Sequence, residues 1–224
     1  LKEIVARAHE VGAVVVLDAC QSAPHMPIDV KELGVDFLVF SGHKALGPTG
    51  VGVLWSSELD DLPPFLYGGS MIETVTMTSA TWAPAPRKFE AGVPNMAQAV
   101  GLGAAIDYLT ALGMSNVQDH EVALTKYLIE KLLQVPDLKI VGPTSIDSRG
   151  AAVSFTVGEI HPHDLGQYVD SQGVAVRTGH HCAWPLTRKL GVPATTRASL
   201  YLYNDKSDCD ALFDAILGAQ KYFA

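Results

Sequence analysis

Two short apolar runs, each followed at once by polar residues, constrain the fold of this 224-residue chain more than any other feature. Residues 13–17 read Ala-Val-Val-Val-Leu and end at Asp18, and residues 35–40 read Val-Asp-Phe-Leu-Val-Phe and are followed by Ser-Gly-His-Lys. Continuous β-branched runs of this length are typical of strands covered on both faces in a parallel sheet. Because ligands of such α/β sheets bind beyond the carboxyl ends of the strands, Asp18 and Lys44 mark a candidate site.

The rest of the chain alternates between helical and strand patterns around one long loop region. The chain opens inside a helical pattern that Gly12 ends, and a third strand is predicted at 52–55. Residues 56–95 carry many Gly, Pro, Thr and Ser residues and are predicted to form loops, which at such length are usually functional or part of an interface. The remaining predictions are helices at 96–112, 115–134, 163–172 and 207–223, and strands at 151–157, 174–177 and 197–202.

The composition excludes several classes of protein. The net charge of −8 argues against a nucleic-acid or anionic-membrane surface, because both need a basic footprint. A hydrophobic share of 48% with 18% charged residues indicates a globular, core-rich chain. No apolar run approaches the length of a membrane span, and the first residues lack the apolar segment of a signal peptide. Three cysteines without CxxC spacing favour a reducing, cytoplasmic location.

Lys44 and Asp18 together predict a pyridoxal 5′-phosphate site. A lone lysine on a turn is ordinarily solvated, and a lone aspartate after a strand is ordinarily a cap, so only the pair is informative. The cofactor needs a lysine for its Schiff base and a carboxylate that keeps its pyridine nitrogen protonated. Gln21 could donate to the cofactor's phenolate oxygen, and Ser41 and His43 carry an O–H and an N–H suited to a phosphate.

Cys182 is the candidate nucleophile. It lies in Arg-Thr-Gly-His-His-Cys-Ala-Trp-Pro at 177–185, where neighbouring imidazoles and an arginine favour the thiolate. A lone cysteine is more often buried and inert, but the glycine, histidines and proline around this one predict an exposed loop. Cys20 and Cys209 lack such surroundings and are expected to be structural. Metal binding at this loop is not expected, because adjacent histidines point apart.

Five segments resemble a class II, SufS-like cysteine desulfurase, and they span most of the chain in that family's order. The Arg-Thr-Gly-His-His-Cys loop is the most specific of them. The resemblance implies a fold-type I aminotransferase architecture, with residues 1–103 as the C-terminal part of the large cofactor domain and 104–224 as the small C-terminal domain. The five segments are Asp18–Gln21, Ser41–Lys44, Phe89–Asn95, Arg177–Pro185 and Arg197–Asn204.

The resemblance implies a role for each candidate residue. Lys44 corresponds to the Schiff-base lysine and the proton carrier, and Asp18 to the partner of the pyridine nitrogen. Arg197 corresponds to the clamp on the substrate α-carboxylate, although an arginine on a strand is often only a surface ion pair. Cys182 takes sulfur from L-cysteine as a persulfide, and L-alanine is released. The remaining cofactor contacts implied by the resemblance are Gln21, Ser41 and His43.

The resemblance also implies partners. The persulfide sulfur passes to a SufU- or SufE-like acceptor protein for Fe–S cluster assembly, and the enzyme is a cytoplasmic homodimer. The segment His161–Asp164 resembles one that offers a histidine to the zinc of a SufU-type acceptor, which points to His163. The alternative is a plain helix N-terminus with Asp164 in its first turn.

Two departures from the family pattern leave alternatives open. Val93 stands where the family commonly has a threonine that reaches the partner subunit's phosphate, and valine cannot donate that hydrogen bond. The resemblance covers a little over half of such an enzyme, so the 224 residues alone are expected to be inactive. Alternatives are a selenocysteine lyase, another fold-type I enzyme such as an aminotransferase, and a truncated module without catalysis.

Overall fold

The computed structural model describes residues 1–147 and 149–224, which form two compact units, Leu1–Met114 and Ser115–Ala224. The boundary predicted at 103/104 falls inside helix α3 (Met96–Leu112), which lies wholly in the first unit. The assignment of the two units to a large and a small domain stays a prediction. In the described residues, no helix is both long and apolar enough to cross a membrane.

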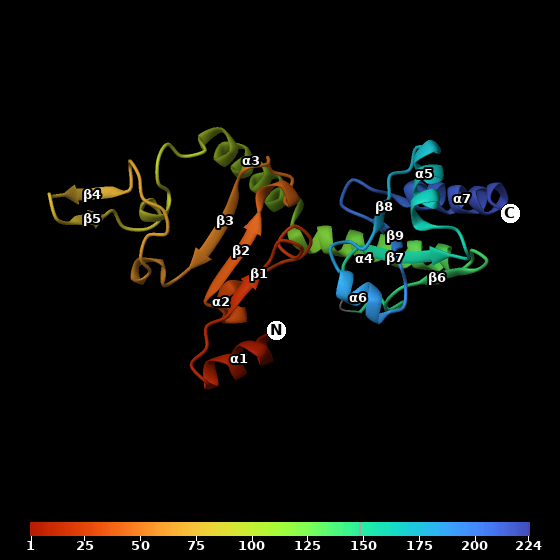
Figure 1. Ribbon diagram of the computed structural model, residues 1–224, viewed down its shortest axis with the longest axis horizontal. Coiled ribbons are helices and arrows are strands. Elements are labelled where there is room, and N and C mark those ends of the chain that lie inside the picture. The colour runs from red at the N-terminus through yellow and green to blue at the C-terminus, as the bar shows by residue number, and fades with distance from the viewer. Residues whose placement is uncertain (148) are drawn as a thin grey trace. The chain divides into compact units, whose positions relative to one another are not determined.

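The first unit is built on a three-stranded sheet of β1 (Val16–Asp18), β2 (Phe37–Ser41) and β3 (Gly52–Ser56), in that order (Figure 1). Strands β1 and β2 are parallel, as predicted, but β3 runs antiparallel to β2. The connection 42–51 is too short for the crossover that parallel strands need, which takes about a dozen residues or more. The expected burial on both faces is also wrong here, because the Val16 side chain is 60% exposed.

The predicted helix at 96–112 is confirmed by α3, which ends before Gly113. The loop region 56–95 contains a small hairpin that the sequence did not predict, and Figure 1 shows it extending away from the three-stranded sheet. The other elements of this unit are α1 (Lys2–Glu10), α2 (Val30–Leu33), η1 (Gly42–Lys44), η2 (Leu59–Asp61), β4 (Ile72–Val75), β5 (Ala80–Trp82) and η3 (Arg87–Phe89).

The second unit is an antiparallel sheet with helices. Its strand order is β6-β7-β9-β8, with β6 at Leu138–Ile140, β7 at Ala152–Val157, β8 at Arg177–Gly179 and β9 at Thr195–Ser199. The strand predicted at 174–177 overlaps β8 only at Arg177, and β6 was not predicted. The helices are α4 (Met114–Leu132), α5 (Pro162–Ser171), α6 (Trp184–Lys189) and α7 (Lys206–Tyr222).

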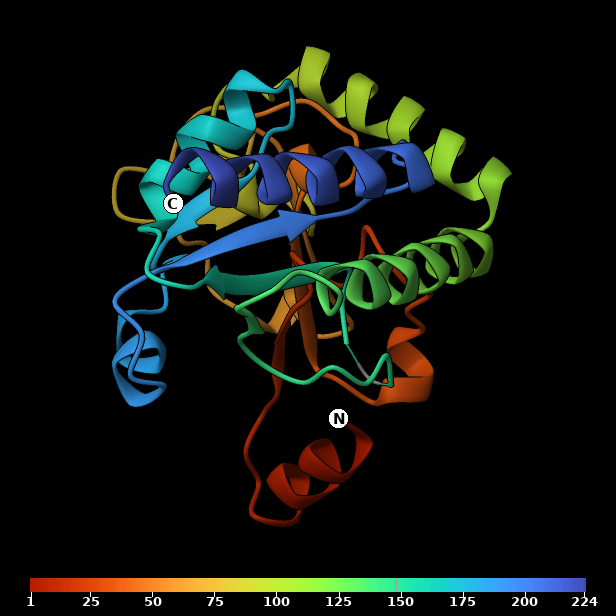
Figure 2. The same ribbon diagram turned by 90° about the vertical axis from the view of Figure 1, so that its right-hand side faces the viewer.

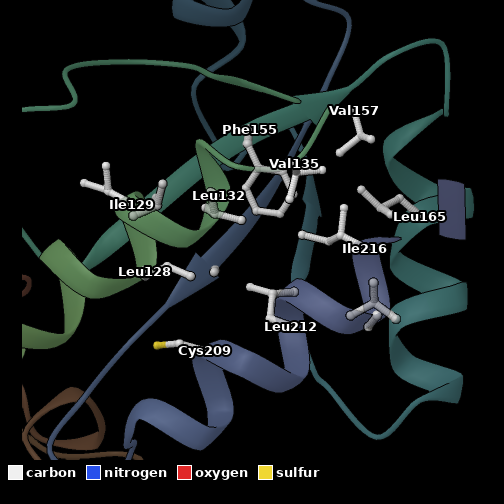
Figure 3. Close-up of a cluster of buried hydrophobic side chains, with 14 of the residues drawn as sticks. Leu128, Ile129, Leu132, Val135, Phe155, Val157, Leu165, Cys209, Leu212 and Ile216 are labelled. Carbon is white, nitrogen blue, oxygen red and sulfur yellow. The ribbon is translucent and has the colours of Figure 1, made fainter. Parts of the chain in front are cut away.

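One hydrophobic core holds the second unit together. On β7 every second side chain is fully buried, at Val153, Phe155 and Val157, as expected for a strand with one face on the core. Figure 3 shows side chains of α4, α5 and α7 gathered around Phe155. Helix α6 lies on the other side of the strands from α5 and α7 in both Figure 1 and Figure 2. The core therefore fixes β9 and, through it, the edge strand β8.

Candidate active site

The first unit brings Asp18, Ser41 and Lys44 to one edge of its sheet. Asp18 is the last residue of β1 and Ser41 the last residue of the parallel strand β2, where Asp18 pairs in register with Val39. Lys44 ends the single 3-10 turn that follows β2. The geometry thus agrees with the prediction that these groups lie beyond the carboxyl ends of adjacent parallel strands.

Asp18 is held ionised by its surroundings. Its Oδ1 accepts a hydrogen bond from the Cys20 backbone N–H at 2.9 Å. The backbone and side chain of Cys20 hold the pKa of Asp18 below its usual value, and the positive charge of Lys44 lowers that pKa further. The Cys20 thiol in turn lies 3.4 Å from the Ser41 hydroxyl. This edge therefore combines an anionic carboxylate, a hydroxyl and an ammonium group.

Backbone packing fixes the turn that carries Lys44. The Gly42 N–H donates to the Val51 carbonyl, and the N–H groups of Ala45 and Gly47 both donate to the Gly42 carbonyl, each at 2.9 Å. A Cβ at Gly42 would lie 2.9 Å from Val51 Cγ1, so only glycine fits there without a shift. The turn is a rigid platform for the lysine.

Gln21, His43 and Val93 are exposed in the structure, Val93 by 84%. Gln21 lies in the turn after β1, and His43 lies beside Lys44 in η1. Their contacts to a cofactor stay predictions.

The second unit brings Cys182, Arg177 and Arg197 together. Cys182 is exposed, as predicted, and its Sγ lies 3.4 Å from Arg177 Nη2. Arg177 on β8 is directly opposite Arg197 on β9, an arrangement of like charges that destabilises a sheet unless an anion lies nearby. Burial and the charge of Arg177 lower the pKa of Arg197, while Cys182 raises it. Two guanidinium groups therefore lie near one exposed thiol.

Cys182 sits on a tight turn with unusual backbone geometry. The Ala183 N–H donates to the His180 carbonyl at 2.8 Å, and both central residues have positive φ, 51° at His181 and 63° at Cys182. Left-handed backbone costs about 1–2 kcal/mol per non-glycine residue. This strain is local to the candidate nucleophile.

The side chain of His181 is tied to β9. Its Nε2 lies 2.8 Å from Thr195 Oγ1, while its Nδ1 is buried and has no hydrogen-bond partner among the described residues. Burial, followed by the charges of Arg197 and Arg177, lowers the pKa of His181. The imidazole is therefore neutral at physiological pH.

Cys209 differs from Cys182 in both exposure and environment. It is 1% exposed inside the helical core, and burial raises the pKa of its thiol to about 11. This environment supports the expectation that Cys209 is structural.

His163 lies at the N-terminus of α5, where His161 caps the helix and Asp164 lies in the first turn. The His163 Nδ1 is 3.2 Å from Thr178 Oγ1, and its ring stacks on that of His161 with centroids 5.6 Å apart. The exposed position suits both the acceptor role and the plain helix start.

Thr195 is the residue at this site that the sequence did not reveal. It shares one face of β9 with Arg197 and Ser199, and the Arg197 Nε donates to Ser199 Oγ at 3.1 Å. The sequence offered one signal: alternate residues of a strand share a face, so the residue two positions before Arg197 lies on the same face as Arg197. Its contact with His181 depends on the pairing of β8 with β9, which the sequence does not state.

An exposed thiol can act as a nucleophile, and the two guanidinium groups beside it can bind the carboxylate of an anionic substrate. A carboxylate and a lysine at a sheet edge can hold a nitrogen heterocycle with an aldehyde. The described residues therefore support two kinds of chemistry, attack by a thiol and binding of a heterocyclic aldehyde.

Comparison with known proteins identifies the family. The model of the aminotransferase class-V family matches residues 1–212. A probable cysteine desulfurase of Streptomyces coelicolor is 60% identical over the whole chain, which covers 54% of that protein. The chain thus spans about half the length of the curated relatives it matches.

Solved structures agree in fold. The cysteine desulfurase CsdA of Escherichia coli matches 99% of the chain and 55% of its own length, with a TM-score of 0.91 and 36% identity. The structure of C-DES with glycine covalently linked to its PLP cofactor matches 96% of the chain and 55% of its own length, with a TM-score of 0.81 and 26% identity. These matches confirm the predicted α/β, fold-type I architecture, and the chain belongs to the aminotransferase class-V family.

Proposed function

We propose that the intact protein is a pyridoxal 5′-phosphate-dependent cysteine desulfurase. The observation that carries this proposal is the exposed Cys182 thiol 3.4 Å from the Arg177 guanidinium, in a chain 60% identical to a probable cysteine desulfurase. An aminotransferase of the same family has no need of such a thiol. The proposal therefore rests on Cys182 more than on the fold.

The sheet edge of the first unit fits the cofactor. Lys44 would hold the aldehyde, and it makes no ion pair with a carboxylate among the described residues, which leaves its amine available. Asp18, already ionised, would hold the pyridine nitrogen in its protonated form. The bound cofactor supplies an electron sink for the substrate carbon. The proposed phosphate and phenolate contacts are Ser41, His43 and Gln21.

Cys182 carries the sulfur step. Its thiolate attacks the substrate sulfur, so that an S–S bond forms on Cys182 while the Cβ–S bond of cysteine breaks. Lys44 returns the proton that it takes from the substrate Cα, and L-alanine leaves. The products, a Cys182 persulfide and alanine, together contain all the atoms of the free thiol and cysteine, so no outside oxidant is needed.

Arg197 binds the substrate carboxylate. Its planar fork matches two carboxylate oxygens, and its side chain is half-buried on the rigid strand β9. Burial and then the charge of Arg177 lower the pKa of Arg197, and a carboxylate bound between the two guanidinium groups would offset their repulsion.

The remaining parts of the proposal concern the surroundings of the enzyme. The intact protein would be a cytoplasmic homodimer that passes sulfur to a SufU- or SufE-like acceptor for Fe–S cluster assembly. His163, exposed at the start of α5, would contact that acceptor. The exposed Val93 would leave the phosphate contact between subunits to backbone groups.

The test is Cys182→Ser in the intact, cofactor-loaded protein. We expect the yellow absorbance of the bound cofactor to remain, because Lys44 and Asp18 are unchanged. Persulfide formation, measured as a mass increase on the protein, and alanine release from L-cysteine should both be lost. Selenocysteine, supplied in a parallel assay, distinguishes a desulfurase from a selenocysteine lyase.

Cys209→Ala is the matched control, since it removes a thiol that is buried in the core. It should keep alanine release even if the protein becomes less stable. Undiminished alanine release by Cys182→Ser, or equal losses in the two variants, would refute the role of Cys182.

A further inference from the structure

The turn at 180–183 needs an external restraint. Two consecutive residues with positive φ at its centre are the pattern of a type I′ turn, which is dominated by Gly, Asn and Asp. Here the two positions hold His181 and Cys182. Positive φ is uncommon at any residue other than glycine, and the enrichment that histidine shows there does not extend to cysteine. Strained backbone of this kind persists only when the surrounding structure fixes it.

One side-chain hydrogen bond fastens the centre of the turn to the sheet. His181 Nε2 meets Thr195 Oγ1 at 2.8 Å, and Thr195 is only 2% exposed. Thr195 is paired in register with Gly179, the last residue of β8 before the turn. The bond therefore joins the strained residue to the rigid strand beside which the turn begins.

The charged groups around His181 favour the neutral ring in this bond. Burial has the largest effect in lowering the pKa of His181, and Arg197 on β9, Arg177 on β8 and His180 in the turn lower it further, while the Thr195 backbone acts in the opposite direction. A proton on the buried Nδ1 would have no acceptor among the described residues. The neutral ring can donate from Nε2 to the threonine hydroxyl.

Cys182 depends on the same restraint, because it is the next residue of the turn. In the left-handed conformation of the structure, its Sγ lies 3.4 Å from Arg177 Nη2. Relaxation of the turn to negative φ would rotate the Cα–Cβ bond of Cys182 and remove the thiol from this position. His180, the first residue of the turn, stacks on Trp184 with ring centroids 3.7 Å apart. This contact does not involve the two central residues, His181 and Cys182.

We propose that His181 and Thr195 are positioning residues, whose hydrogen bond holds the strained turn that presents the Cys182 thiol beside Arg177. The proposal rests on the proposed desulfurase function and names residues that govern its sulfur step. Neither residue touches the reacting atoms, so both act through the turn.

The test compares Thr195→Val with Thr195→Ser in the intact, cofactor-loaded protein. Valine keeps the shape of threonine and removes the hydroxyl, whereas serine keeps the hydroxyl. Hydrogen exchange, followed by mass spectrometry, reports on a peptide that covers residues 180–184, including the Ala183 N–H. Persulfide formation on Cys182 after mixing with L-cysteine is measured in parallel.

In Thr195→Val we expect exchange in the turn to become about fivefold faster, the factor that one ordinary hydrogen bond represents. Persulfide formation should slow by about 10- to 100-fold, as for a misplaced reacting group. The cofactor absorbance and the exchange of the core strand β7 should not change. Thr195→Ser should show wild-type rates of both turn exchange and persulfide formation. His181→Phe keeps an aromatic ring and removes both ring nitrogens. It should behave like Thr195→Val, and it replaces that variant in the test if Thr195→Val does not fold.

Unchanged turn exchange in Thr195→Val, or failure of serine to restore it, would overturn the proposal. Slow persulfide formation with an unchanged turn would overturn it too, since the hydroxyl would then act by another route. If the wild-type protein forms no persulfide from cysteine, the proposed function fails, but the exchange comparison still decides whether the hydrogen bond holds the turn.

Discussion

At position 42 the absence of a side chain determines where Lys44 lies. The Gly42 carbonyl accepts two hydrogen bonds from the turn, and a Cβ there would meet Val51 Cγ1 at 2.9 Å and the Val51 carbonyl oxygen at 3.0 Å. The backbone carbonyl cannot yield as a flexible side chain can. An added methyl group must therefore displace the turn that carries Lys44.

Gly42→Ala should lower the free energy of unfolding by about 1–3 kcal/mol, the usual cost of overpacking. It should also weaken cofactor binding, because Lys44 moves with the turn. Gly103→Ala is the matched control: this helical glycine has nothing within 4 Å of an added Cβ, so alanine should stabilise by about 0.4–1 kcal/mol. Denaturant unfolding and cofactor absorbance of the intact protein measure both effects, and changes of the same sign would contradict this account.

Sequence reasoning found Asp18 and Lys44 because strand ends in a parallel pair share an edge of the sheet, a rule that needs no side-chain detail. It did not find Thr195, because residues 181 and 195 meet only through the pairing of β8 with β9. Nor could it find the strain at Cys182, since positive φ at a non-glycine residue has no signature in the sequence. Local sequence patterns therefore predicted the candidate residues. The contacts that hold those residues in place depend on the pairing of strands that are distant in the sequence.

At the scale of elements, the sequence predicted long helices correctly and missed short strands. Helix α3 was predicted at its observed bounds, with Gly113 at a φ of 83° to end it. The hairpin of β4 and β5 was missed because β4 has four residues, all exposed, and so carries no alternation of buried and exposed side chains. The three-residue strand β6 was missed for the same lack of length.

Helix α4 offers a sharp test of how the core stabilises the second unit. Leu132 is fully buried, whereas its neighbour Leu133 is 60% exposed. Leu132→Ala should therefore cost about 2–5 kcal/mol through lost burial and the remaining cavity, while Leu133→Ala should stay within about 0.5 kcal/mol of wild type. Urea unfolding followed by circular dichroism measures both. Similar costs for the two substitutions would mean that Leu132 is not in the core.

At the scale of the whole molecule, the two units differ in how much apolar surface they cover. The core of the second unit is made entirely by its own residues, between Leu124 and Ala219. The first unit leaves Val14 and Leu54 of its sheet region 62% and 47% exposed, and a hollow lined by Phe40, Trp55 and other apolar side chains is open beside α3. A domain can fold alone when its own residues make its hydrophobic core. The described residues of the second unit make such a core, whereas those of the first unit leave apolar sheet side chains open to solvent.

Residues 114–224, which include all of α4, should therefore fold when expressed alone. We expect one cooperative thermal transition with a heat-capacity change of about 1.3–1.7 kcal/mol/K, the value for a domain of this length, measured by calorimetry. Residues 1–113 expressed alone should instead bind the apolar dye ANS, because their sheet side chains are open to solvent. A broad transition in 114–224 would show that its core needs the rest of the chain, since a complete core unfolds in one step.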